Sequence, residues 1–171
     1  ATHYSGIFYD ISERKTVEER LDQLAHYDAL TGLPNRSLLM DRLEQSVERA
    51  SRQGCRVGVL YLDLDHFKQV NDTHGHATGD CLLREVAHRM KSCVRAVDTP
   101  ARLGGDEFVV LVPDIAGRDD LDAVARKLIE ALAPVYMAEG HAVSTQASIG
   151  ISVFPDNGHS VQELMRHADA A

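Results

Sequence analysis

Three acidic residues are the first candidates for chemistry in this sequence. Asp63 ends the apolar run 57–62, while Asp106 and Glu107 follow a pair of glycines. If the two segments are neighbouring strands, their carboxylates converge, and burying several carboxylates together is costly unless a cation neutralises them. Ligands that are all oxygen favour magnesium or manganese over zinc. The alternative is that the acids merely end a strand and solvate a turn, but the paired glycines also clear space for a ligand.

The elements that position these acids are predicted from hydrophobic periodicity. We expect a helix capped by Asn35 or Ser37 that ends near Gly54, a buried central strand over 57–62, a helix from Gly79 to about Arg95, strands around 101–103 and 107–112 that form a hairpin, a helix over 121–132, a strand pair over 135–138 and 142–154, and a final short helix capped by Ser160 and Glu163. This order predicts an α+β fold with a central, mainly antiparallel sheet flanked by helices.

The first residues differ from the rest of the chain. Residues 6–11 alternate like the end of a strand, and Thr16 with Glu19 can form a capping box for a helix that carries Leu21 and Leu24. We therefore expect the tail of an upstream unit over 1–12, a linker helix over 13–27 and the main domain over 28–171. The pattern fits an ordinary surface helix and a dimerising coil equally well.

Composition excludes several classes of function. The 171 residues carry a net charge of −8 with both signs interspersed, which argues against a nucleic-acid partner. Three cysteines without a CxxC pair indicate neither a disulfide framework nor a zinc site, and they suit a reducing cytoplasm. No apolar run reaches the roughly 20 residues of a membrane span. His74 and His76 suggest a metal pair, but their loop context favours a structural or solvated role.

Residues 102–108, Arg-Leu-Gly-Gly-Asp-Glu-Phe, resemble the signature of GGDEF domains, the diguanylate cyclases. Four further segments agree in order and spacing, namely 28–36, 63–72, 75–80 and 147–151. The resemblance implies the nucleotidyl cyclase or polymerase palm fold, which is ferredoxin-like. It implies a homodimeric enzyme that condenses two GTP molecules into cyclic di-GMP and pyrophosphate. The alternative is a GGDEF domain that binds GTP or cyclic di-GMP without catalysis and regulates a neighbouring domain.

The resemblance also implies roles for single residues at the catalytic centre. Asp63 and Asp106 would ligate Mg²⁺ or Mn²⁺ with help from the Leu64 carbonyl, and Glu107 would stand beside them. Asp106 is the family's candidate base, while activation of the hydroxyl by metal is an equal alternative. In two-metal phosphoryl chemistry the ions stabilise charge on the attacking and leaving oxygens.

Further residues would bind the nucleotide. Asn71 and Asp80 would hydrogen-bond the guanine edge, for which an amide and a carboxylate are chemically suited. The residues that would face the phosphates or leave room for them are the backbone amides around His66 and Phe67, the side chain of Lys68, and the turn glycines Gly104 and Gly105.

A second site and two neighbouring segments complete the resemblance. Arg95 and Asp98 look like the RxxD product-inhibition site, with Arg126 as the distal partner; a helix-end ion pair is the simpler alternative. Residues 6–15 resemble the exit of a PAS sensory domain, which implies an upstream sensor. The family normally continues past residue 171 into a segment with a lysine and an arginine that contact the triphosphate, so we expect the end of the domain to be missing here.

Overall fold

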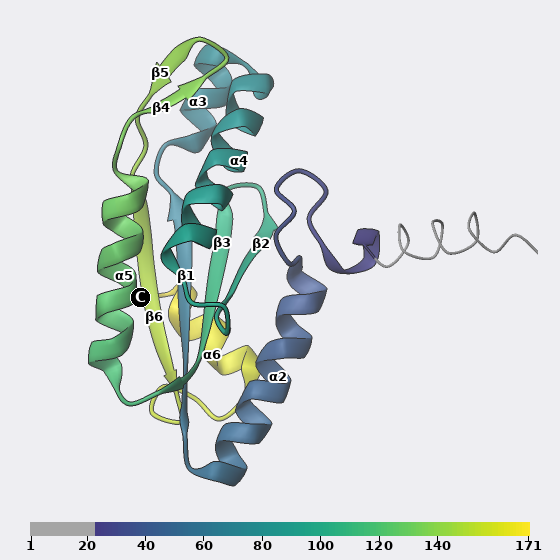
Figure 1. The fold of residues 1–171 in the computed structure, drawn as a ribbon, viewed down its shortest axis with the longest axis vertical. Helices are drawn as coiled ribbons and strands as arrows, with labels where there is room; N and C mark the ends of the chain where they lie inside the picture. Colours follow the sequence, from purple (N-terminus) through teal and green to yellow (C-terminus); the bar gives the residue numbers. More distant parts are fainter. Residues whose placement is uncertain (1–22) are drawn as a thin grey trace, which may run out of the picture.

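A four-stranded antiparallel sheet forms the centre of the computed structural model, which describes residues 23–171. The strands are β1 (Arg56–Leu64), β2 (Thr99–Gly104), β3 (Glu107–Ile115) and β6 (Ala147–Phe154). They lie in the order β2-β3-β1-β6 (Figure 1). Together with the intervening helices the chain runs βαββαβ, which is the ferredoxin-like order. The predicted α+β class with a mainly antiparallel sheet is confirmed.

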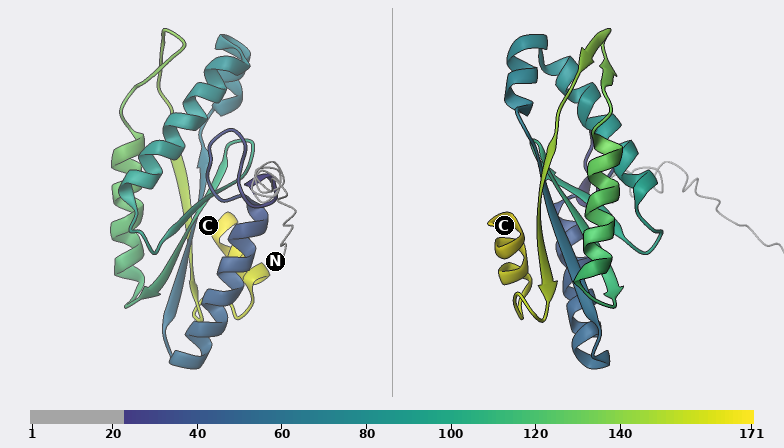
Figure 2. Two further views of the ribbon diagram at one scale, coloured as in Figure 1. Left: turned by 45° about the vertical axis from the view of Figure 1, so that its right-hand side comes forward. Right: turned by 90° about the vertical axis from the view of Figure 1, so that its left-hand side faces the viewer.

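Helices cover both faces of this sheet. One face packs against α4 (His76–Cys93) and α5 (Arg118–Leu132), and the other packs against α2 (Arg36–Gln53) and α6 (Val161–Asp169), as Figure 2 shows. Leu60 and Leu62 of β1 belong to the first core, whereas Val57 and Val59 belong to the second. Because both faces of β1 are buried, its sequence is a continuous apolar run.

The predicted helix ends are confirmed where polar side chains set them. The Asn35 side chain accepts a hydrogen bond from the Leu38 amide at 3.1 Å, and α2 ends at Gln53, followed by the capping residue Gly54 with φ 71°. At α6 the Glu163 amide donates to Ser160 Oγ at 3.2 Å, while Glu163 Oε2 accepts from the His159 amide at 2.8 Å. The bonds from the Leu38 and Glu163 amides satisfy free N–H groups of a first helical turn.

The helix predicted to follow Gly79 begins earlier, and a further helix precedes it. The prediction missed α3 (Phe67–His74), and α4 begins at His76 and ends at Cys93. Gly75, with φ 85° and ψ 162°, separates the two helices. Only Phe67 and Val70 of α3 are buried, so this short helix shows too little periodicity to be recognised.

The predicted strand pair over 135–138 and 142–154 was wrong in its second member. That segment divides into β5 (His141–Val143), which pairs with β4 (Tyr136–Ala138), and β6, which pairs with β1 in the main sheet. Between them, the Thr145 hydroxyl donates to the Asp65 carbonyl at 2.8 Å. The break therefore comes from contacts with the loop after β1, which a local strand pattern does not reveal.

The expected upstream tail over 1–12 and most of the expected linker helix over 13–27 lie outside the described residues. Residues 23–26 are helical. From residue 23 onward, every helix is too short or too polar to cross a bilayer.

Candidate functional site

The three acids singled out in the sequence come together at one end of the sheet. Asp63 on β1 lies directly opposite Glu107 on β3 in the antiparallel register. Residues so opposed have Cβ atoms about 4.5–5.5 Å apart. The β2–β3 turn passes through Gly104 at φ 144° and Gly105 at φ 51°, which other residues rarely adopt, and Asp106 follows directly.

The electrostatics of Asp63 reflect this crowding. Burial raises the pKa of its carboxyl above the ordinary range, and the negative charges of Asp106 and Glu107 raise it further. Smaller contributions in the same direction come from Asp65 and Asp169. The ionised form of Asp63 is therefore disfavoured by repulsion from its neighbours, and a bound cation would relieve that repulsion.

The donors present suit a magnesium-type ion that shares its coordination with a ligand. Within residues 23–171 no three His, Cys, Asp or Glu side chains form a ready-made metal cage. Asp65 is engaged elsewhere, because its carboxylate accepts from Ser148 Oγ at 2.9 Å. Magnesium is usually held by one or two carboxylates together with substrate phosphates and water. Asp63, Asp106 and Glu107 fit that mode of binding.

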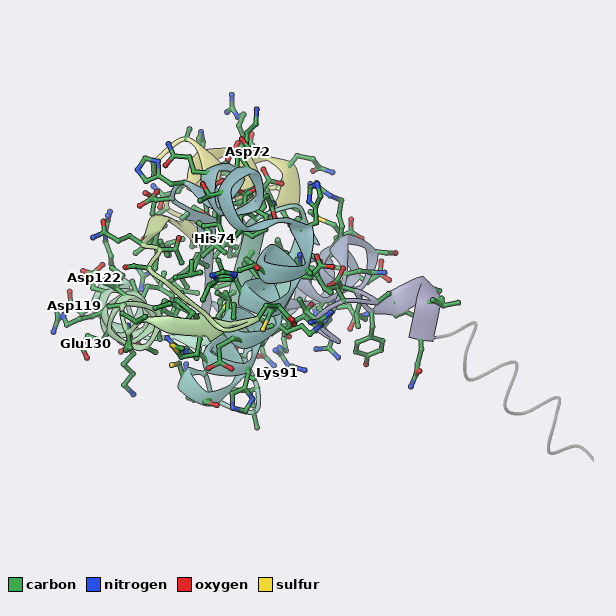
Figure 3. All side chains as sticks on the ribbon, turned by 90° about the horizontal axis from the view of Figure 1, so that it is seen from above. Asp72, His74, Lys91, Asp119, Asp122 and Glu130 are labelled. Atoms are coloured by element: carbon green, nitrogen blue, oxygen red, sulfur yellow. The ribbon has the colours of Figure 1, made fainter. Side chains whose placement is uncertain are left out.

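Asn71 and Asp80, the two residues predicted to contact guanine, come from adjacent helices. A Cβ atom at Gly79 would lie 2.0 Å from Asn71 Oδ1, so Asn71 occupies the space that the glycine leaves on α4. This contact places Asn71 beside the residue that precedes Asp80. Seen from above, the next side chain of α3, Asp72, points outward (Figure 3). An amide and a carboxylate thus lie near each other, both half-buried.

The residues predicted to face phosphate lie at the start of α3. His66 adopts a left-handed conformation at φ 62°, and its carbonyl accepts from the Gln69 amide at 2.9 Å. The Phe67 side chain is buried in the core, whereas Lys68 is exposed. Only the backbone of Phe67 is therefore available to a ligand, and the first amides of a helix are natural anion contacts.

Arg95 and Asp98 form the ion pair that the sequence offered as the simpler alternative. The Arg95 amide donates to Asp98 Oδ2 at 2.8 Å, and its Nε lies 3.5 Å from the same oxygen. The Asp98 side chain is 1% exposed, and its Oδ1 is buried without a partner in the described part of the chain. Arg126 is exposed on α5, which packs against α4.

An ion pair anchors the glycine turn, and the sequence interpretation assigned it no role. Arg102 Nη1 lies 3.0 and 3.1 Å from the two carboxylate oxygens of Asp28, while its Nε and Nη2 donate to the Gly105 carbonyl at 3.1 and 2.7 Å. Burial alone would raise the pKa of Asp28, but hydrogen bonds from Thr31 and Arg102 outweigh it and lower that pKa. Asp28 and Arg102 both lie in segments that resemble the family, 28–36 and 102–108. Their pairing could not be predicted, because they are 74 positions apart in the sequence.

The sequence interpretation also missed Tyr61 and Asp169. Strand alternation puts Tyr61 on the same face of β1 as Asp63, which is the available sequence signal. Both missed residues line a small cavity of about 150 Å³ together with Asp63. Burial, hydrogen bonding to Glu107 and the nearby carboxylates raise the pKa of the Tyr61 hydroxyl well above its ordinary range.

Histidines 74 and 76 do not act as a pair. The His74 ring packs against that of His141 on β5, with ring centroids 4.8 Å apart and planes inclined at 37°, while His76 is exposed.

In Figure 3 the labelled acids of α5, which are Asp119, Asp122 and Glu130, lie on the outer side of that helix.

The family model described as diguanylate cyclase, GGDEF domain, matches residues 25–171. The chain belongs to the GGDEF domain family. A curated relative, the bifunctional diguanylate cyclase/cyclic di-GMP phosphodiesterase MucR of Pseudomonas aeruginosa, is 52% identical to this GGDEF domain over 153 residues, which are 88% of the chain and 22% of MucR. The chain spans roughly a fifth to a third of the length of the curated relatives it matches.

Solved structures agree with the fold of this GGDEF domain. The isolated GGDEF domain of TpbB from P. aeruginosa superposes with a TM-score of 0.82 at 37% identity, covering 84% of each chain. The coiled coil and GGDEF domain of DgcB from Caulobacter crescentus, in complex with c-di-GMP, superposes with a TM-score of 0.81 at 28% identity, covering 94% of this chain and 86% of that one. The palm-like arrangement expected from the resemblance is thereby confirmed.

Proposed function

We propose that this GGDEF domain is a diguanylate cyclase, which condenses two GTP molecules into one cyclic di-GMP and two pyrophosphates. The observation that carries the proposal is the opposition of Asp63 and Glu107 beside Asp106, where burial and then the repulsion of the neighbouring carboxylates raise the pKa of Asp63. A module that had lost catalysis has no need to maintain this unfavourable cluster. The intact site therefore favours the enzyme over a domain that only binds nucleotide.

In the proposed reaction the 3′-hydroxyl of one GTP attacks the α-phosphorus of the other, and a second attack closes the ring. Asp63, Asp106, Glu107 and the Leu64 carbonyl would hold Mg²⁺ or Mn²⁺. When bound, such ions stabilise negative charge on the phosphate oxygens. We assign the carboxylate of Asp106 as the base that accepts the proton of the attacking hydroxyl.

Residues of α3 and α4 would bind the guanine base of the substrate. Asn71 can donate to and accept from the guanine edge, and Asp80 can accept from its N–H groups. The amides around His66 and Phe67, together with Lys68, would bind the terminal phosphates. The left-handed glycines of the β2–β3 turn, Gly104 and Gly105, would leave room for the nucleotide to approach the acids.

Two further features belong to the proposal. Each domain would hold one GTP, so two copies must face each other, and the active form would be a homodimer. Product would bind at Arg95, Asp98 and Arg126, because arginine forks suit phosphates and stack on bases. DgcB, a structural relative, has been crystallised with c-di-GMP.

We place the domain in the cytoplasm, a reducing compartment that its free cysteines suit. We also place it downstream of a sensory domain in the same chain, because residues 6–15 resemble the exit of a PAS domain. The second candidate function is a GGDEF domain that binds GTP or cyclic di-GMP and regulates a neighbour. Two other curated relatives, PdeR of Escherichia coli and NbdA of Pseudomonas aeruginosa, are named as cyclic di-GMP phosphodiesterases and not as cyclases, which favours that candidate.

The test is to incubate the full-length protein with GTP and Mg²⁺ and to follow cyclic dinucleotide by chromatography and pyrophosphate by a coupled assay. Formation of cyclic di-GMP with two pyrophosphates supports the cyclase. Tight binding of GTP or cyclic di-GMP without product would leave the regulatory module. The absence of product and of affinity for either nucleotide would rule out both functions.

A further inference from the structure

Tyr61 lies in a position that connects the acids of the site to α6. On β1 it stands two residues before Asp63 and on the same face, and across the sheet it lies opposite Val109. Glu107 is two residues from Val109, so Tyr61 and Glu107 are diagonal neighbours on one face of the sheet. Side chains in that relation are within reach of each other when one is aromatic.

On the other side of Tyr61, its partner on β6 is Gly150, which has no side chain and leaves space for α6. A Cβ atom at Gly150 would lie 1.8 Å from the Ala168 carbonyl, so the last turn of α6 rests directly on this strand. Asp169 follows Ala168 and lines the small cavity of about 150 Å³ with Tyr61 and Asp63. The phenol therefore lies between a carboxylate of β3 and a carboxylate of α6.

A tyrosine hydroxyl has one proton to donate. The strand register places the Glu107 carboxylate diagonally across from Tyr61 on the same face, so Glu107 is the acceptor that the sheet itself offers to this hydroxyl. Asp169 lies on the side of α6, where it lines the cavity with Tyr61 and Asp63. The ring itself packs with the apolar residues under α2 and α6, which fixes where the hydroxyl lies.

We propose that Tyr61 is a positioning residue whose hydroxyl holds the Glu107 carboxylate beside Asp63, so that the two acids are arranged for a divalent cation before the cation binds. The proposal rests on the assigned metal role of Glu107. Without the hydroxyl, the Glu107 side chain can turn away from Asp63, which repels it. The metal would then have to bring Glu107 back into position, and this cost weakens metal binding. The alternative is that Tyr61 only fills space under α6, and phenylalanine would then serve equally well.

The test measures metal affinity in the full-length protein and needs no turnover. Mn²⁺ binding is titrated by electron paramagnetic resonance of the free ion, in the presence of a GTP analogue that cannot react at the α-phosphorus. Tyr61→Phe should weaken Mn²⁺ binding by about tenfold, since removing a group that orients a metal ligand typically costs 10–100-fold in affinity. Its melting temperature without metal should not fall, because the ring and its packing are retained.

Tyr136→Phe is the matched control. The Tyr136 hydroxyl is buried and donates to the Leu132 carbonyl at 2.7 Å, far along the chain from the acids, so its loss should leave Mn²⁺ affinity unchanged. In a Glu107→Gln background, Tyr61→Phe should cause little additional loss, because the carboxylate it positions is gone.

Wild-type affinity for Mn²⁺ in Tyr61→Phe, or an equal loss in Tyr136→Phe, would overturn the positioning role. The result separates this role from the proposed reaction. If wild-type protein makes no cyclic dinucleotide but Tyr61→Phe still weakens Mn²⁺ binding selectively, the positioning role stands and the cyclase does not. Failure of wild-type protein to bind Mn²⁺ would refute both.

Discussion

The ion pair between Arg102 and Asp28 should be the most sensitive link between the start of the domain and the glycine turn. Replacing Arg102 with glutamine removes the contacts at 3.0 and 3.1 Å to Asp28 and both donors to the Gly105 carbonyl. The side chains of Arg102 and Asp28 are only 10% and 21% exposed. Truncating one partner of a fully buried pair costs about 3–5 kcal/mol, whereas an exposed pair contributes about 0–1 kcal/mol.

The low exposure places this pair nearer the buried limit, so we expect a loss of about 2–4 kcal/mol in the free energy of unfolding. For a domain of this size that corresponds to a fall of about 4–16 °C in melting temperature. Asp28→Asn should cost a similar amount, and the double variant should cost little more than either single one, because both remove the same interaction.

Urea denaturation of the four proteins gives the required cycle, and Arg118→Gln provides the control. Arg118 pairs with Asp122 at 4.0 Å, with side chains 69% and 48% exposed, so its loss should cost less than about 1 kcal/mol. The lowered pKa of Asp28 means that its stabilisation is present above the ordinary value of 3.8 and is lost as pH falls through the lower folded-state value. If Asp28→Asn and Arg118→Gln are equally mild at neutral pH, the anchoring role is refuted.

Three further outcomes are expected. Asp63→Asn should stabilise the metal-free protein by about 0.2–1 kcal/mol, because directly opposed like charges are destabilising; a lower melting temperature in EDTA would contradict this. Gly79→Ala should weaken GTP binding by about tenfold, or about 1.4 kcal/mol, by displacing Asn71, whereas Gly117→Ala, whose Cβ meets no atom within 4 Å, should bind like wild type. Arg95→Ala should relieve inhibition by added cyclic di-GMP, and undiminished inhibition would place the product site elsewhere.

The sequence predicts the parts of this fold whose cause is local. The continuous apolar run predicted the buried central strand, and the paired glycines predicted the β2–β3 hairpin. Asn35 and Ser160 indicated where two helices begin. The short α3 was missed because it has two buried residues and follows a left-handed His66. The division between β5 and β6 was missed because Thr145 bonds to Asp65, which is 80 positions away.

The same distinction holds for the site. The acids were found from residue type and turn chemistry, and the register then placed Asp63 opposite Glu107. Tyr61 could have been found from strand alternation with Asp63, whereas Asp169 was missed because its relation to the acids depends on how closely α6 approaches Gly150. Such an approach is a property of the packed structure, and no pattern along the chain encodes it.

The most direct test of the central claim compares the full-length protein with its Asp106→Ala variant in the presence of GTP and Mg²⁺. The wild-type protein should release two pyrophosphates for each cyclic di-GMP, and the variant should form none while keeping its melting temperature within a few degrees. Equal turnover by the variant would contradict the assignment of the acidic cluster, and GTP binding without product in the wild type would contradict the cyclase itself.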